Sequence, residues 1–111
     1  METVLGKTDK LGRVLMHEHL TIDLSREKDA DANLNDDKAM IEDLKMLKTV
    51  GIHTIIDVTN VGMGRDVGRM AMISEKSGVN VVAATGFYKT PFLPDMVYEK
   101  SVRELSSFMI T

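Results

Sequence analysis

Three short apolar segments rich in β-branched residues alternate with stretches of helical periodicity along this chain. The segments cover residues 13–16, 52–58 and 79–84. Short apolar segments of this kind are typical of strands buried on both faces, as in parallel sheets covered by helices. Because strand and helix patterns alternate, we expect right-handed βαβ units, and the sequence therefore predicts an α/β fold.

Capping residues mark the ends of three predicted helices. The stretch Asn35-Asp36-Asp37 supplies a cap and early negative charge for the first helix, which Gly51 ends. Asp66 and Gly78 begin and end the second, and Asp95 begins a third. The apolar positions expected on the buried faces are Met40, Ile41, Leu44, Leu47 and Val50, then Val67, Met70, Ala71 and Ser74, then Val102, Leu105 and Met109. The polar stretch 25–35 has no period and predicts a loop over the mouth of the fold.

The number of units and the length predict a partial TIM barrel. A complete (β/α)8 barrel needs about 250 residues, and 111 residues hold three units, with a short hairpin expected before the first strand. We expect residues 1–111 to be the N-terminal part of a single barrel whose C-terminal remainder is absent. A small, complete three-layer α/β domain is the alternative that the pattern leaves open.

Composition limits the chemistry and the partners. The chain has no cysteine, so a metal would have to be held by imidazole and carboxylate groups. A net charge of -3 without a concentrated basic face argues against nucleic-acid binding. No apolar run of about 18 residues and no secretory signal is present, so we expect a cytoplasmic protein that does not bind a membrane.

The sequence His17-Glu18-His19 is the feature most suggestive of chemistry. In a strand, residues two apart project from the same face, so both imidazoles would point together. Two nitrogen donors make half of a divalent metal site. They lie at the C-terminal end of the first buried strand, where the active sites of barrels are built. The alternative is a pair of exposed histidines that bind no metal.

Three blocks of sequence resemble the phosphotriesterase family. Residues 11–20 follow its first-strand pattern, roughly L-G-x-T-L-x-H-E-H-L, with Val14 in place of the usual Thr. Residues 51–59 with Gly-Arg-Asp at 64–66, and then residues 80–88, are similar to the second and third blocks. The Gly-Phe-Tyr ending of the third block is closer to phosphotriesterase-related proteins and sugar-lactone hydrolases than to organophosphate-degrading enzymes, where Trp is usual at position 88.

The resemblance implies a zinc-dependent hydrolase with two divalent ions per complete site, manganese and cobalt being alternatives. The ions would lower the pKa of a shared water, and the resulting hydroxide would attack a lactone or a phosphoester. His17 and His19 match metal ligands, while the bridging Lys or Glu, two further histidines and an Asp would lie beyond position 111. Tyr88 and Asn60 are the expected substrate-binding residues; for Tyr88 the alternative is an aromatic ring packed in the loop, and Asn60 lies at the mouth end of the second strand. No catalytic residue is expected within the chain, which should be inactive by itself, and the full-length protein is a candidate homodimer.

Four other polar residues are expected to be structural. Asp57 interrupts an apolar strand, so it should be paired or hydrogen-bonded, with Arg65 as a partner. His53 begins the second strand, at the end of a barrel opposite the active site. Glu18 should point away from the histidine pair and pack or bond between strand and helix. The competing functions are a nuclease-like amidohydrolase and a non-catalytic remnant, or α/β piece, that needs another chain to complete its fold.

Overall fold

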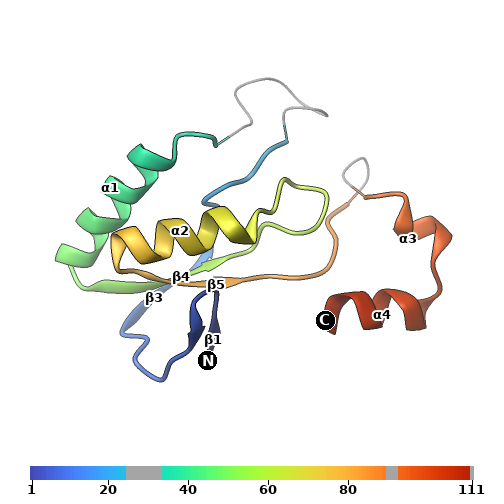
Figure 1. The fold of residues 1–111 in the computed structure, drawn as a ribbon, viewed down its shortest axis with the longest axis horizontal. Helices are drawn as coiled ribbons and strands as arrows, with labels where there is room; N and C mark the ends of the chain where they lie inside the picture. The colour runs from blue at the N-terminus through green and yellow to red at the C-terminus, as the bar shows by residue number, and fades with distance from the viewer. Residues whose placement is uncertain (25–33, 90–92, 111) are drawn as a thin grey trace.

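The computed structural model describes residues 1–24, 34–89 and 93–110, and the predicted loop at 25–35 falls mostly outside them. Its centre is a three-stranded sheet of order β3-β4-β5, formed by Arg13–Glu18, Ile52–Asp57 and Asn80–Ala83. Both strand pairs are parallel, and β4 is the central strand. The helices α1 and α2 lie on the same side of this sheet and contact each other (Figure 1). The predicted α/β fold with three βα units is therefore confirmed.

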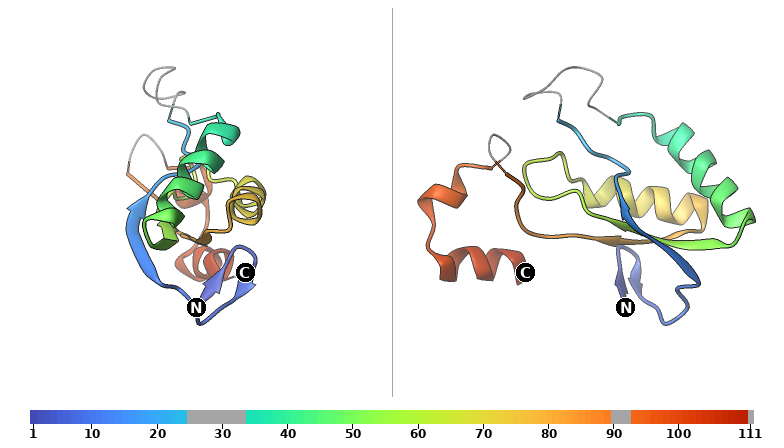
Figure 2. Two further views of the ribbon diagram at one scale, coloured as in Figure 1. Left: turned by 90° about the vertical axis from the view of Figure 1, so that its left-hand side faces the viewer. Right: turned by 180° about the vertical axis from the view of Figure 1, so that it is seen from behind.

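A small antiparallel hairpin precedes the sheet, as predicted. Its strands are β1, Glu2–Thr3, and β2, Gly6–Lys7, so it closes before the first buried strand begins. The backbone N–H of Val4 donates to the carbonyl of Val81 in β5, at 2.8 Å. The hairpin thus packs against the third strand of the sheet, from which it is distant in sequence (Figure 2).

The first two helices begin and end where their capping residues predicted. The side chain of Asp36 accepts a hydrogen bond from the N–H of Ala39 at the start of α1, Asp37–Thr49. Asp66 does the same for Arg69 in α2, Val67–Ser77, and Gly78 ends that helix with φ +75°. The side-chain oxygen of an N-cap residue bonds to a backbone N–H in the first turn that has no partner within the helix.

The core lies between the sheet and these two helices. Its buried members are Leu20, Ile41, Leu44, Ile55, Met70, Ile73, Val79 and Val81. Two predicted members of the helix faces were wrong: Val50 is the C-cap of α1 and 64% exposed, and Val67 is 43% exposed in the first turn of α2. The buried face of α2 also includes Ile73 and Ser77, whereas Val67 is the first residue of the helix and stays exposed although it lies close to Ser74 around the helix axis.

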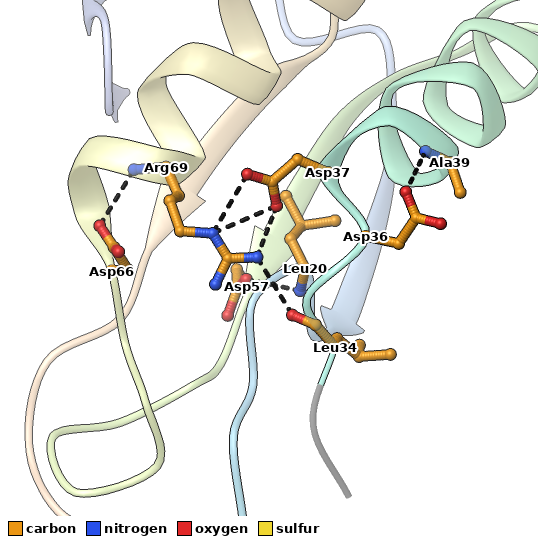
Figure 3. Close-up of polar contacts among 8 residues, drawn as sticks. All are labelled: Leu20, Leu34, Asp36, Asp37, Ala39, Asp57, Asp66 and Arg69. Atoms are coloured by element: carbon orange, nitrogen blue, oxygen red, sulfur yellow. Dashed lines mark hydrogen bonds and ion pairs between the residues drawn. The ribbon is translucent and has the colours of Figure 1, made fainter. Parts of the chain in front are cut away.

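The ion pair between Arg69 and Asp37 joins the N-terminal ends of the two helices (Figure 3). The Nε of Arg69 donates to Asp37 Oδ1 at 3.1 Å, and its Nη2 also donates to the carbonyl of Leu34 at 3.1 Å. The hydrogen bond with Asp37 raises the pKa of the Arg69 guanidinium above its ordinary value. One arginine therefore fixes both the start of α1 and the segment that enters it.

The third predicted helix is two helices, α3, Met96–Glu99, and α4, Val102–Ile110. The break occurs because Ser101 and Glu104 form a capping box: the N–H of Glu104 donates to Ser101 Oγ, and the N–H of Ser101 donates to Glu104 Oε1. Val102, predicted to be buried, is 82% exposed. The ring of Phe108 stacks on Phe87, with 6.3 Å between centroids, so α4 contacts the segment after β5. Within the described ranges, no helix has the length and apolar character needed to cross a membrane.

Candidate metal centre

His17 and His19 lie side by side at the C-terminal end of β3. Their ring centroids are 5.6 Å apart and the rings are edge to face, at 84°. The pairing register of β3 with β4 shifts between Leu15 and Glu18, so the strand is irregular at His17. Both imidazoles nevertheless line one cavity of about 330 Å³. The structure thus brings the two histidines together as the spacing of two predicted.

The cavity is formed by the ends of all three parallel strands. Besides the histidines it is lined by Asn60 and Tyr88, the two residues predicted to bind substrate, and by Val58, Met63 and Ala84. Tyr88 is 41% exposed, and the ammonium of Lys89 lies 5.5 Å from the centre of its ring. A second hollow, of about 530 Å³, lies between α1 and α2 and is lined by surface residues of both charges. Of these two hollows, both lined by described residues, the cavity at the strand ends is the one that combines imidazoles with a tyrosine and an amide.

The Thr59 side chain is hydrogen-bonded to the His19 ring and does not line the cavity. Its Oγ1 is 2.9 Å from His19 Nδ1, and Thr59 is fully buried just beyond the end of β4. The His17 ring forms no hydrogen bond with any residue that the structure describes. Each imidazole therefore keeps at least one nitrogen for a ligand. The sequence reasoning missed Thr59, although a polar residue directly after a buried strand at the mouth of a barrel is a usable signal.

Asp57 is fully buried and bonded to backbone N–H groups. Its Oδ2 accepts from the N–H of Leu20 at 2.9 Å (Figure 3). Its Oδ1 accepts from the N–H of Thr59 at 2.8 Å. The predicted structural role is confirmed, but the predicted partner is wrong. Arg65 donates instead to the carbonyl of Ala84, at 2.7 Å, and so ties the loop after β4 to the end of β5.

The remaining two predicted structural residues lie outside the cavity lining. His53 is at the opposite end of β4, where its ring covers Gly12; a Cβ on Gly12 would lie 2.6 Å from His53 Cδ2. Glu18 is half-buried, and its carbonyl accepts from the N–H of Val58 at 3.0 Å. Its carboxylate forms no hydrogen bond or ion pair with the residues that the structure describes, so of the two predicted roles, packing or bonding between strand and helix, bonding is not observed and packing agrees with its partial burial.

The donors at the cavity fit half of a metal site. Two neutral imidazoles suit zinc and its neighbours among the transition metals, and the absence of cysteine leaves nitrogen and oxygen as the ligand atoms. In the described part of the chain, no group of three or more His, Asp or Glu side chains could hold an ion. A catalytic zinc normally takes three protein ligands, so further donors have to come from elsewhere.

Comparison with known proteins agrees with this geometry. The model of the phosphotriesterase family matches residues 1–111. The chain is 39% identical over 103 residues to the phosphotriesterase homology protein of Escherichia coli, covering 92% of this chain and 35% of that protein. It is 31% identical over 104 residues to the aryldialkylphosphatase of Saccharolobus solfataricus, covering 90% of this chain and 33% of that protein.

Structural similarity extends over the same residues. A crystal structure of the Escherichia coli phosphotriesterase homology protein superposes with a TM-score of 0.87 and 38% identity, covering 93% of this chain and 36% of that one. The three βα units therefore have the fold of a partial TIM (β/α)8 barrel, as predicted. The chain spans about a third of the length of the curated relatives that it matches. It belongs to the phosphotriesterase family of hydrolases.

Proposed function

We propose that His17 and His19 supply the first two ligands of a two-metal hydrolase centre that cleaves an ester-like bond. The observation that carries this proposal is the convergence of both imidazoles on one cavity at the C-terminal ends of the strands. Active sites of (β/α)8 barrels are built at that end. Membership of a family whose enzymes use two metal ions gives the same expectation from an independent direction.

The cavity residues suggest how a substrate would be held. Two divalent ions, when bound, supply an activated water and polarise the oxygen under attack. The hydroxyl of Tyr88 and the amide of Asn60 line the same cavity and are able to hydrogen-bond the oxygens of a lactone or phosphoester. Val58, Met63 and Ala84 form an apolar wall that would limit water around the reacting bond.

The names of the relatives support an ester-like or phosphorus-containing substrate. One relative is an aryldialkylphosphatase, and the crystal structure of the Escherichia coli protein is described as complexed with phosphate in its active site. The Gly86-Phe87-Tyr88 sequence favours a lactone, through its similarity to sugar-lactone hydrolases. We therefore propose a lactone or phosphoester as substrate, zinc as the metal, and the cytoplasm as the compartment.

We further propose that residues 1–111 alone are inactive. Two imidazoles are fewer than the three protein ligands that a catalytic zinc usually takes. Size-exclusion chromatography of the 111-residue chain tests whether these residues are an incomplete barrel. A folded, soluble monomer would argue against an incomplete barrel, whereas aggregation or obligatory pairing would support it. For the full-length protein, the same column tests the homodimer.

The decisive experiment uses the product of the complete reading frame that contains these residues, purified with zinc or manganese. We expect it to bind metal and to hydrolyse lactones or aryl esters, and we expect His17→Asn and His19→Asn each to lower both metal content and activity. His53→Asn is the matched control, because His53 lies at the other end of β4. Absence of metal from the wild-type protein, or equal metal content in all three variants, would refute the proposal.

A further inference from the structure

A chain of hydrogen bonds leads from a buried carboxylate to the His19 ring. Asp57 accepts from the N–H of Leu20, the residue after His19, and from the N–H of Thr59. The Oγ1 of Thr59 lies 2.9 Å from His19 Nδ1. Asp57 and Thr59 are both fully buried. The position of His19 is therefore fixed twice, by the bond between Asp57 and the N–H of the next residue, Leu20, and by the bond between Thr59 and the ring of His19.

The partner of Nδ1 decides which nitrogen is left for a metal. Because Thr59 occupies Nδ1, Nε2 is the nitrogen of His19 that remains for a ligand. A hydroxyl can donate or accept, so it can bond to either tautomer of the ring. A metal on Nε2 requires the proton on Nδ1, and Thr59 then accepts that proton in a hydrogen bond. Such outer partners orient histidine ligands in metal sites generally.

We propose that Thr59 is a positioning residue that directs Nε2 of His19 toward the metal, with Asp57 holding Thr59 in place. This inference rests on the proposed function, since it concerns the same metal site. Thr59 does not line the cavity, so it would act on the metal only through His19. Removing its hydroxyl should therefore leave the fold intact but loosen the ring.

A second buried threonine offers a matched control. Thr54 lies in β4, and its hydroxyl donates to the carbonyl of Leu11. It lies near the N-terminal end of β4, whereas Thr59 follows the C-terminal end. Thr54→Val and Thr59→Val thus delete the same group from equally buried positions, and only Thr59→Val removes a partner of His19.

The test measures zinc affinity of the complete reading-frame product by competition with a chromophoric chelator. We expect Thr59→Val to weaken zinc binding by about 10- to 100-fold, as is typical for the loss of an outer-shell partner. Thr59→Ser should bind as the wild type does, because it restores the hydroxyl, and Thr54→Val should also retain wild-type affinity. Equal affinity of Thr59→Val, Thr54→Val and wild type would overturn the positioning role while leaving the proposed function standing.

A second readout keeps the proposal testable if Thr59→Val does not fold. In zinc-loaded wild-type protein with ¹⁵N-labelled histidine, His19 signals are assigned with the variant His19→Gln. We expect Nε2 to carry the shift of a metal-bound nitrogen and Nδ1 to carry a proton. A metal-bound Nδ1 would overturn the proposal, because that nitrogen could not bond to Thr59. Wild-type protein that binds no zinc would refute the proposed function, and the positioning role would fail with it.

Discussion

Asp57 gives the sharpest test of how the strand ends are held together. Asp57→Asn keeps the size and shape of the side chain but replaces one acceptor oxygen with an NH₂ group. In the native structure both oxygens accept from backbone N–H groups, those of Leu20 and Thr59, at 2.9 and 2.8 Å. Asparagine can accept from only one of them. The other N–H would face a donor, in a site that has no access to solvent.

The expected cost follows from the two bonds. Losing one hydrogen bond to a charged acceptor costs about 1.5–3 kcal/mol, and the remaining bond weakens because the amide oxygen is neutral. Removing a buried charge offsets part of this loss, because an ionised group is expensive to bury. We therefore expect Asp57→Asn to lower the free energy of unfolding by about 1–3 kcal/mol.

Urea unfolding of the complete reading-frame product, followed by circular dichroism, measures this free energy. Asp66→Asn is the matched control, because Asp66 is an exposed N-cap and asparagine caps a helix as well as aspartate does. The control should change stability by less than about 0.5 kcal/mol. If Asp57→Asn were as stable as Asp66→Asn, the two backbone bonds would not be holding the strand ends together.

Two further predictions concern the helix ends. Hydrogen bonds from Ser101 lower the pKa of the Glu104 carboxyl. The ionised carboxylate therefore stabilises the folded state at pH values above its unfolded pKa, and this stabilisation is lost as pH falls through its folded pKa. The Cα chemical shifts of α4 should lose helical character in that acidic range, and Glu104→Gln should remove the pH dependence. Gly78→Ala should lower the free energy of unfolding by about 1 kcal/mol, because φ at this position is +75° and Lys48 Nζ would lie 2.6 Å from the added Cβ. Gly68→Ala is the control, because Gly68 has an ordinary helical φ, and it should leave the protein as stable or raise the free energy of unfolding by up to about 1 kcal/mol. Urea unfolding measures both variants.

The elements that local chemistry defines were predictable from the sequence. Asp36 caps the start of α1 and Asp66 caps the start of α2, each through a side-chain hydrogen bond to a residue three positions later. Gly78 ends α2 through the positive φ of that residue. The break between α3 and α4 could also have been predicted, since Ser101 and Glu104 have the spacing of a capping box. It was missed because the apolar period of residues 95–109 suggested one continuous helix.

The candidate site divides in a similar way. The i, i+2 spacing was sufficient to predict that His17 and His19 share a face, because side chains in a strand alternate with a period of two. That Asn60 and Tyr88 lie beside them followed from the expectation that parallel strands end at one edge, combined with the family resemblance. Within the described residues, the cavity contains both pairs.

What the order of residues could establish was the set of elements, their parallel arrangement and the type of ligand, because propensity, periodicity and side-chain chemistry act over a few neighbouring positions. The partners of the buried polar groups depended on the packed fold. Asp57 bonds to Leu20, 37 residues away, rather than to Arg65, and Thr59 bonds to a histidine 40 residues earlier. A buried polar group must form a hydrogen bond, and its partner is a group on the neighbouring strand. Which group that is depends on the register of β3 against β4, which brings positions distant in sequence together.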